Sequence, residues 1–404
     1  MLSQTTKKTS FLILKLLLVL VFVCFFIKVI IVYQSHASER AQFAAQNKTI
    51  EQLIESRRLN SDTSGSTSPF NDTGVLNVLF IGLDSRIGQE NGHCDAIQLL
   101  TLDTNQNTIL ITAVPRGTYS SLPPGTAATS TDYYVSNACG FGGIDYGIKQ
   151  IEKILGVQAD YVAIVGFSET VGILRYLKLP TTETIQWLRN RHGYSIGEPQ
   201  RARNHSTFIR QMILKFVNKE QSFLDTSLQH IVYKLIKTDL TFDQVQIILD
   251  TILSMDLQNN PEHIQLTMRP LYLVQDIEYD PNHIDDNLDQ TIEKISQLLS
   301  KDDYSNDSKE VFEEKLSTTI TTNIHNKEFI VWAYKNSVWL QLDDMNESLD
   351  IQYQIVTSYI DTIDDKKERT ALIADYIIEM EHRNEPIWQQ KGKDLLKQEF
   401  GFDT

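Results

Sequence analysis

The chain has 404 residues and a formal net charge of −15, with 41% hydrophobic and 9% aromatic residues. This length is sufficient for two domains, and this composition supports a large buried core and excludes a disordered chain. The acidic balance argues against general nucleic-acid binding, which requires a basic surface. We therefore expect a folded protein with no nucleic-acid partner.

An apolar segment near the N-terminus predicts a membrane anchor. Residues 11–33 contain only two charged side chains, Lys15 and Lys28, and a helix of this length crosses a hydrocarbon core of roughly 30 Å. Two lysines precede it, so residues 1–10 are expected in the cytoplasm and the rest of the chain outside the cell. Ser-His-Ala at 35–37 leaves a cleaved signal peptide as the alternative, although the apolar run is longer than usual for one.

The remaining chain divides by composition into a stalk and linker (34–74), a main domain (75–300) and a helical C-terminal region (301–404). Within the stalk, residues 61–73 are rich in Ser, Thr and Asp, which is typical of a flexible linker. Aromatic residues of the C-terminal region fall within helical patterns, so we interpret them as core residues.

The main domain alternates strand-like and helix-like runs. Strands are predicted at 75–83, 96–102, 108–114, 160–167 and 263–273. The second and third are joined by a short polar turn, which predicts a hairpin. We expect an α/β fold with a mixed central sheet flanked by helices, between an N-terminal transmembrane helix and a helical C-terminal extension.

Helix boundaries in the main domain are predicted from glycines and capping residues. Gly140 is expected to open a helix that ends at Gly156. Ser168 and Glu169 are expected to cap the next helix. A later helix is predicted from Ser206.

Cys94 and Cys139 would both lie in the external compartment, where disulfides persist. The sequence does not decide between a disulfide and two buried free thiols.

Polar residues follow several predicted strands. Asp84 ends the first strand, Asp95 precedes the second and Arg116 follows the third. Carboxylates at a sheet rim are hard oxygen ligands suited to Mg²⁺ or another divalent cation. Asn137 is a further polar candidate for this rim.

A basic segment at 187–216 stands out in this acidic chain. Guanidinium groups bind phosphate oxygens two at a time, which indicates a site for a strongly anionic group such as a diphosphate. Arg189 and Arg191 would face the same way in an extended segment. Glycines and Pro199 are expected to interrupt regular structure before Arg201. A solvated basic surface is the alternative interpretation of such a cluster.

Five motifs in order carry a resemblance to a known family. They are NVLFIGLDSR, HCDAIQLLTLD, TAVPRGTYSSLPPG, SNACGFGG, and RNR followed by GEPQRARNH. Together they resemble the LytR-CpsA-Psr (LCP) family over about residues 76–216. The resemblance implies a membrane-anchored, extracytoplasmic bacterial enzyme that uses Mg²⁺ and transfers a glycopolymer from a polyprenyl-pyrophosphate carrier to a cell-wall glycan acceptor.

The resemblance also implies roles for individual residues. Asp84 and Asp95 match residues that position the metal or the pyrophosphate. The implied catalytic residues, which contact or orient the pyrophosphate, are Arg116, Arg189, Arg191, Glu198 and Arg201. Asn137, Arg203 and His205 are added as substrate-binding candidates.

The chain departs from the family pattern at two places. Gly117 replaces an aspartate, and residues 168–188 form a shorter segment than usual before the arginines, which shortens one wall of the expected tunnel for the polyprenyl tail. Two alternatives to the transferase therefore stay open, namely a non-catalytic envelope protein that binds an anionic lipid or glycan, and a lipid pyrophosphatase.

Overall fold

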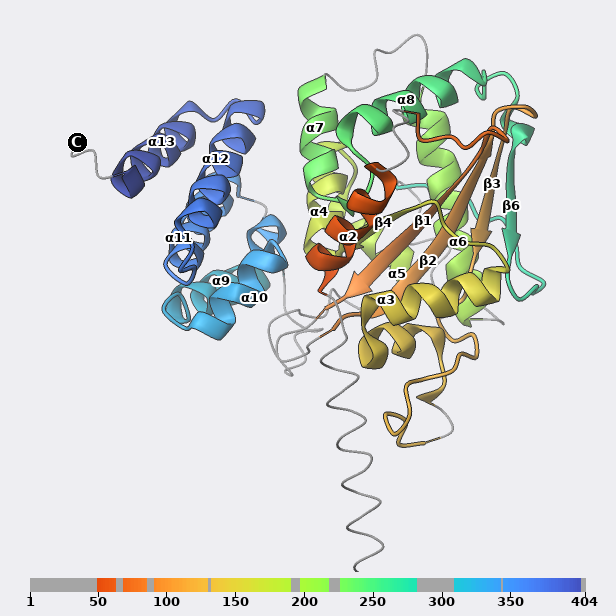
Figure 1. Ribbon diagram of the computed structural model, residues 1–404, viewed down its shortest axis with the longest axis horizontal. Coiled ribbons are helices and arrows are strands. Elements are labelled where there is room, and N and C mark those ends of the chain that lie inside the picture. The colour runs from red at the N-terminus through yellow and green to blue at the C-terminus, as the bar shows by residue number, and fades with distance from the viewer. Residues whose placement is uncertain are drawn as a thin grey trace, which may run out of the picture.

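The computed structural model describes residues 49–62, 68–85, 91–129, 132–189, 197–217, 226–281, 309–342 and 344–400. The described residues form a six-stranded sheet flanked by helices, with a helical C-terminal region beside it (Figure 1). The strands are β1 (Val75–Asp84), β2 (His93–Asp103), β3 (Thr108–Ala113), β4 (Tyr161–Gly166), β5 (Lys237–Thr238) and β6 (Ile264–Met268). The mixed α/β architecture expected from the sequence is confirmed.

Strand order is β5-β4-β1-β2-β3-β6. β1 is parallel to β4 and antiparallel to β2, and β3 is antiparallel to β2 and parallel to β6. The carboxyl ends of β1, β3 and β4 therefore meet the beginning of β2 at one edge of the sheet. Ligands of open α/β sheets bind outside such carboxyl ends.

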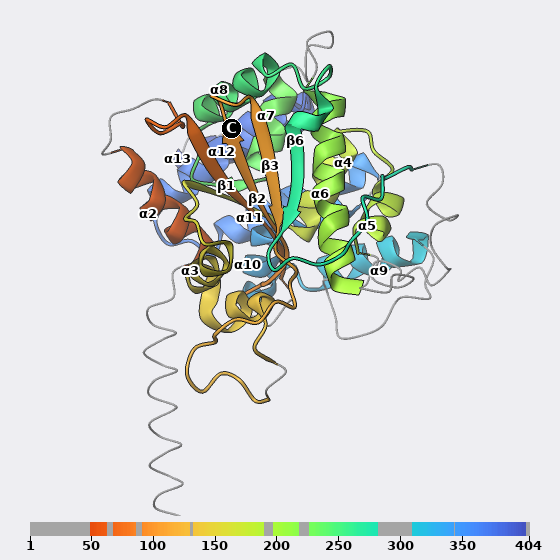
Figure 2. The same ribbon diagram turned by 90° about the vertical axis from the view of Figure 1, so that its right-hand side faces the viewer.

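Helices cover both faces of this sheet. In the main domain they are α2 (Ile50–Asp62), α3 (Val135–Leu155), α4 (Phe167–Tyr176), α5 (Thr181–Arg189), α6 (Gly197–Phe216), α7 (Thr226–Lys234) and α8 (Phe242–Ser254). Leu79 and Ile81 of β1 pack toward α2 and α3, whereas Leu76 and Val78 pack toward α6 and α8. Figure 2 shows the sheet between these layers. Because strand side chains alternate between faces, burial on both sides requires the nearly continuous apolar run of β1.

Part of the predicted stalk belongs to the core. Leu53 and Ile54 of α2 are buried in the cluster under α3. Arg57 donates to Asp239 across 2.6 Å and to the carbonyl oxygens of Ala159 and Asp160. The last turn before the Ser- and Thr-rich linker is therefore attached to the sheet domain.

Three helix boundaries differ from the sequence prediction. α3 begins at Val135 rather than Gly140, and Gly143 (φ 78°) kinks it, while Gly156 ends it in the left-handed conformation as expected. Gly166 rather than Ser168 is the N-cap of α4. α6 begins at Gly197 rather than Ser206.

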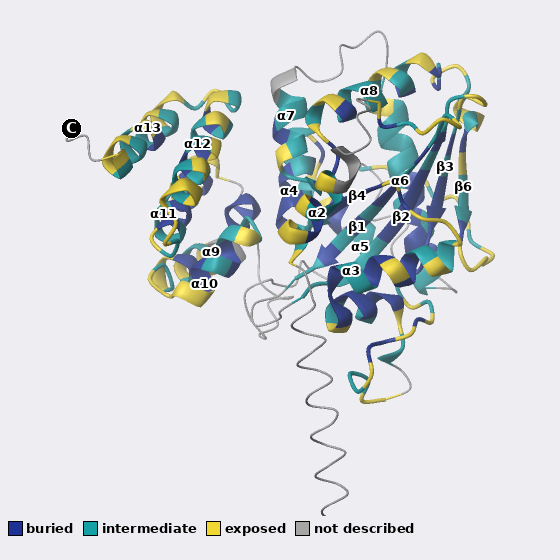
Figure 3. Cartoon of the chain, in the orientation of Figure 1, coloured by how far each residue is buried: buried dark blue, intermediate teal, exposed yellow. Residues whose placement is uncertain are grey.

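The C-terminal region consists of α9 (Lys309–Thr322), α10 (Lys327–Lys335), the short 3₁₀ turn η3 (Val338–Gln341), α11 (Met345–Ile360), α12 (Lys366–His382) and α13 (Pro386–Phe400). Figure 3 shows buried residues along the inner sides of these helices. Phe329, Trp339 and Tyr376 are buried, which confirms that these aromatic residues serve packing.

The predicted membrane segment, residues 11–33, lies outside the described residues. Among the residues that are described, we find no helix with the length and apolar character needed to cross a bilayer.

Cys94 of β2 and Cys139 of α3 form a disulfide with a Cα–Cα distance of 5.8 Å, and both residues are fully buried. The alternative of two free thiols is therefore wrong. The bond attaches α3 to the sheet directly beside Asp95.

The disulfide leads to a first prediction. The chain contains three cysteines, so the oxidised full-length protein, unfolded in detergent and denaturant, should contain one titratable thiol, and reduction should raise this to three. The Cys94→Ser/Cys139→Ser variant should lose about 2–4 kcal/mol of unfolding free energy, because its unfolded chain lacks the cross-link.

Thiol titration and urea unfolding in the presence and absence of a reductant measure both effects. Three free thiols in the oxidised protein would contradict the assignment. The double variant should show no response of its stability to the reductant, and it therefore serves as the control.

Candidate functional site

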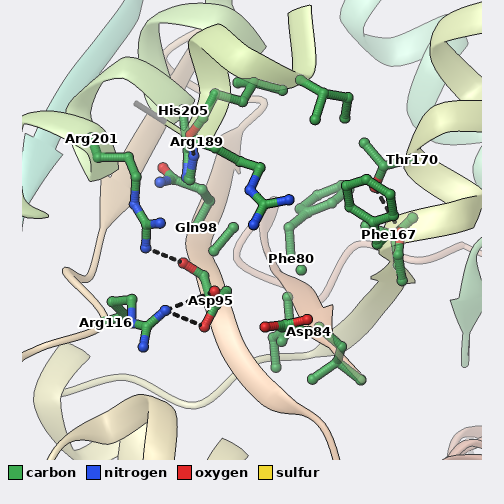
Figure 4. A pocket seen from close by; sticks show the side chains of 18 of the residues that line it. Phe80, Asp84, Asp95, Gln98, Arg116, Phe167, Thr170, Arg189, Arg201 and His205 are labelled. Atoms are coloured by element: carbon green, nitrogen blue, oxygen red, sulfur yellow. Dashed lines mark hydrogen bonds and ion pairs between the residues drawn. The ribbon is translucent and has the colours of Figure 1, made fainter. Parts of the chain in front are cut away.

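A pocket of about 370 Å³ opens at the sheet edge where the carboxyl ends of β1, β3 and β4 meet (Figure 4). One part of its lining is charged and consists of Asp84, Asp95, Arg116, Arg189 and Arg201. The other part is apolar and includes Phe80, Val165, Phe167, Ile185, Leu188, Phe208 and Ile209. The pocket is thus suited to a ligand with an anionic group and a hydrocarbon portion.

A β-bulge directs Asp95 into this pocket. Gly82 of β1 pairs with Ala96 and Leu83 pairs with Cys94, so Asp95 has no partner in the ladder. Such an extra residue changes the direction of its side chain, and bulges occur frequently beside active sites. The sequence prediction placed Asp95 just before the second strand, but it lies within β2 because the strand continues across the bulge to His93.

Two arginines from different elements converge on Asp95. Nη1 of Arg116, which follows β3, donates to both carboxylate oxygens at 2.8 and 2.7 Å. Nη2 of Arg201, on α6, donates to the Asp95 carbonyl oxygen at 3.2 Å and lies 3.0 Å from Oε2 of Glu198. Arg201 is only 6% exposed, so its charge acts in a partly desolvated environment where electrostatic interactions are stronger than in water.

Burial raises the pKa of the Asp95 carboxyl, and the charges of Arg116 and Arg201 lower it in part. Asp84 contributes a further rise of the Asp95 pKa through charge repulsion. The two carboxyl groups therefore interact electrostatically, as expected for neighbours in one site.

The two aspartates fit a magnesium ion that is completed by its substrate. Figure 4 shows the Asp84 carboxylate directed into the pocket near Asp95. Mg²⁺ commonly binds through one or two carboxylates together with water and phosphate oxygens. The described part of the chain contains no group of three or more His, Cys, Asp or Glu residues arranged for a metal. Asp95 would have to share its oxygens between the metal and Arg116.

Arg201 is held by α6, because this helix begins at Gly197 and therefore includes Arg201. Pro199 was expected to interrupt regular structure, yet it lies in the first turn of the helix, where its missing N–H costs nothing. Gln98 of β2 then fixes the helix to the sheet. It donates to the Ala202 carbonyl oxygen at 3.0 Å and accepts from the Ser206 hydroxyl at 2.7 Å, and all three residues are buried.

Arg189 is the last residue of α5, so the condition of an extended segment, under which it would face the same way as Arg191, does not hold at this residue. The end of α5 is held by Trp187, which is buried against Phe208 and Tyr279. The Arg189 guanidinium carbon lies 5.7 Å from the centre of the Phe167 ring. Figure 4 shows this guanidinium directed into the space above Asp84.

His205 lies on α6 in the pocket lining, and its Nε2 donates to the Leu188 carbonyl oxygen at 2.7 Å. Burial, together with the charge of Arg201, lowers the pKa of His205 to about 4. The imidazole is therefore neutral at physiological pH. It links the end of α5, beside Arg189, to α6.

The structure places other predicted residues away from the pocket lining. Arg203 pairs with Asp276 at 2.5 Å. The Asn137 amide donates to the Asp132 carbonyl oxygen at 2.8 Å, within the loop before α3. Glu198 lies in the first turn of α6 beside Arg201 but does not line the pocket. Arg191 lies outside the described residues.

Gln98 and Phe167 are among the lining residues that were not predicted from the sequence. Gln98 lies in an apolar strand, and the only sequence feature that indicates a role is that it is a polar residue among apolar neighbours. Phe167 is one of 17 phenylalanines and has no local signal.

Gly117 is exposed, and a Cβ there would meet nothing within 4 Å, so the aspartate that it replaces would fit.

The shortened segment between β4 and Arg189 contains two helices, α4 and α5. Their residues Phe167, Thr170, Ile185 and Leu188 line the pocket. The apolar wall is thus present despite the shorter segment.

The model of the LytR_cpsA_psr family matches residues 27–172. The matched segment contains β1 to β4 and, with them, Asp84, Asp95 and Arg116, whereas Arg189 and α6 follow it. Curated relatives include the polyisoprenyl-teichoic acid–peptidoglycan teichoic acid transferases TagU of Bacillus mycoides and Bacillus cereus.

The Bacillus mycoides protein is 22% identical over 229 residues, which cover 50% of this chain and 73% of that protein. The Bacillus cereus protein is 23% identical over 159 residues, which cover 38% of this chain and 50% of that protein. Among solved structures, TagV of B. subtilis superimposes with a TM-score of 0.42 and 13% identity, covering 54% of this chain and 95% of that one. The family match and the curated relatives agree with the ordered sequence motifs, and the segment 27–172 of this chain is therefore similar to the LytR-CpsA-Psr family.

Proposed function

We propose that this protein is a phosphotransferase that moves a glycopolymer from a polyprenyl-pyrophosphate carrier to a cell-wall glycan acceptor. The observation that carries the proposal is the division of one pocket into two parts. One part is charged and contains three arginines, and the other is apolar and is formed largely by α4, α5 and α6. A polyprenyl pyrophosphate has the matching chemistry, because its diphosphate and its hydrocarbon tail are adjacent. The names of the curated relatives support the same reaction class.

In the proposed reaction an acceptor hydroxyl attacks the phosphorus that carries the glycan. A new P–O bond forms, the bond to the bridging oxygen breaks, polyprenyl phosphate leaves, and the hydroxyl proton passes to solvent. Arg189 and Arg201 neutralise charge on the phosphoryl groups, and Arg116 holds the Asp95 carboxylate in place. Phosphoryl transfer depends mainly on such positioning and electrostatic stabilisation.

Mg²⁺ would be held by Asp84 and Asp95, and when bound it would supply positive charge to the diphosphate oxygens. Glu198, one of the catalytic candidates from the sequence, lies beside Arg201 and outside the lining. It is better placed to orient the Arg201 guanidinium than to accept the proton of an acceptor.

The proposal includes an anchor in the lipid bilayer at residues 11–33 and an extracytoplasmic domain. The disulfide between Cys94 and Cys139 supports this location, because such bonds persist in oxidising compartments.

The reaction can be tested with the full-length protein in detergent and a polyprenyl-pyrophosphoryl oligosaccharide. Arg201→Ala should lower the release of polyprenyl phosphate by roughly 100-fold or more, because it removes a buried charge from the phosphate site. Arg203→Ala is the matched control, since Arg203 lies two residues further along α6 and pairs with Asp276. It should retain nearly full activity.

The products separate the proposed reaction from its alternatives. Glycan joined to the acceptor supports the transferase, and free glycan phosphate formed without regard to the acceptor would identify a pyrophosphatase. Binding without turnover would identify a receptor. Equal losses in Arg201→Ala and Arg203→Ala would overturn the assignment of Arg201.

Magnesium dependence provides a separate prediction. Chelation should abolish release, and Asp84→Asn should raise the Mg²⁺ concentration for half-maximal activity by about tenfold or more, because it replaces a charged ligand with a neutral one. Titration of activity with Mg²⁺ measures the change. Unaltered Mg²⁺ dependence in Asp84→Asn would exclude Asp84 as a ligand. Asp276→Asn, outside the pocket lining, is the control.

The neutral state of His205 predicts a pH dependence of stability. Its folded pKa, about 4, lies below the ordinary value of 6.5, so the unfolded chain binds a proton more readily and stability is lost as pH falls from about 6.5 to about 4. Acidification from pH 7.5 to pH 5.0 should therefore lower the free energy of unfolding by about 2 kcal/mol through this residue.

Urea unfolding of the wild type and His205→Gln at both pH values tests this expectation. The variant should be less stable at pH 7.5 but should lose less stability on acidification. Parallel pH profiles for the two proteins would contradict a neutral, buried His205.

A further inference from the structure

The C-terminal region contacts the main domain at one wall of the pocket. The 3₁₀ turn η3 lies against α4, where Arg175 donates to the Leu340 carbonyl oxygen at 2.8 Å. Gln341 donates to the Ser168 hydroxyl at 3.0 Å, with both residues buried. These hydrogen bonds join segments about 170 residues apart, so they require a specific docking of η3 on α4.

Close packing reinforces this contact. A Cβ atom added to Gly172 of α4 would lie 3.1 and 3.3 Å from the two terminal methyl groups of Leu340. Leu340 is 3% exposed and belongs to a hydrophobic cluster built mainly from α9, α10, η3 and α11. The small residue at position 172 therefore allows η3 to approach the α4 backbone.

Phe167 connects this cluster to the pocket. It is the first residue of α4 and packs against the cluster that contains Leu340. It also lines the pocket, where its ring lies beneath the Arg189 guanidinium. An aromatic face attracts a guanidinium within about 6 Å of its centre. One side chain thus contacts both the C-terminal region and a candidate phosphate-binding arginine.

We propose that Phe167 is a positioning residue that holds Arg189 over the phosphate site, and that the C-terminal region supports Phe167 through Leu340. The region from α9 to α11 is then a functional part of the transferase site although none of its described residues lines the pocket. This inference rests on the proposed function for its activity readout, but binding of inorganic pyrophosphate provides a readout that needs no turnover.

A double-mutant cycle in the full-length protein tests the connection between Phe167 and Arg189. Phe167→Leu keeps an apolar side chain but removes the ring, and it should weaken pyrophosphate binding and lower kcat by about tenfold. In an Arg189→Met background, Phe167→Leu should change the affinity for pyrophosphate and kcat by less than about twofold each, because the guanidinium that Phe167 holds is absent. Phe167→Tyr, which keeps the ring, should recover most of the loss.

The values of kcat and KM distinguish a Phe167 that positions Arg189 from a Phe167 that only contacts the hydrocarbon tail. If Phe167 acts through Arg189, Phe167→Leu should lower kcat about tenfold, and any accompanying rise of KM for the carrier should disappear in the Arg189→Met background. If it only contacts the hydrocarbon tail, KM should rise at unchanged kcat, and its effect should multiply with that of Arg189→Met. Either of those results would overturn the inference.

A matched pair of variants tests the support from the C-terminal region. Leu340→Ala removes the contact with α4, whereas Leu349→Ala removes an equally buried leucine of α11 from a separate cluster without Phe167. Both should lower Tm. At a temperature well below either transition, only Leu340→Ala should weaken pyrophosphate binding, by about threefold or more.

Equal effects of the two leucine variants on binding would overturn the role of η3. Failure of the wild type to bind pyrophosphate would overturn the inference as a whole. Pyrophosphate binding with the expected coupling, but without release of polyprenyl phosphate, would instead support the inference and overturn the proposed transferase activity.

Discussion

The ion pair between Arg116 and the bulged residue Asp95 is the interaction on which the site depends. It joins the end of β3 to the beginning of β2 at the rim of the sheet. The same residue offers its carbonyl oxygen to Arg201, so three elements meet at one position. Without these partners, the desolvation cost of the partly buried carboxylate would be uncompensated. The ion pair and the fold around it therefore stabilise each other.

Charge in the pocket is distributed so that it favours anions without leaving a cation unsupported. Three arginines face two aspartates in the lining, within a chain of net charge −15. Arg116 is supported by Asp95, Arg201 by Glu198 and Arg189 by the face of an aromatic ring. An anionic group such as a diphosphate would therefore meet groups that are already oriented, which lowers the cost of reorganisation.

Strands β1 to β4 were predictable because burial on both faces requires apolar runs, and each of these strands contains one. Asp84, Asp95 and Arg116 were predictable for the same reason, since each is a polar residue at the end of such a run. The beginning of α6 was missed because proline and glycine usually interrupt helices, whereas Pro199 lies in the first turn, where proline is tolerated. Arg203 shares its residue type and its helix with Arg201, and only the rotation of α6 decides which of them faces the pocket.

Other features depend on contacts between distant segments and could not be read from local patterns. The pairing of Cys94 with Cys139 depends on how α3 packs on β2. The role inferred for Phe167 depends on a turn about 170 residues away. Gln98 is a polar exception in a strand, and its function becomes visible only with the partners that α6 brings to it.

The two outer strands of the sheet have a consequence for self-association. β5 has only two residues, and α2 contacts it, with Glu51 lying 3.5 Å from Lys237. β6, at the opposite side, has five residues and is followed directly by Arg269 and Pro270. Unpaired strand edges can recruit strands from other molecules and start aggregation, and short edges, covering helices, charges and proline all oppose this. The sheet is therefore protected against edge-to-edge polymerisation.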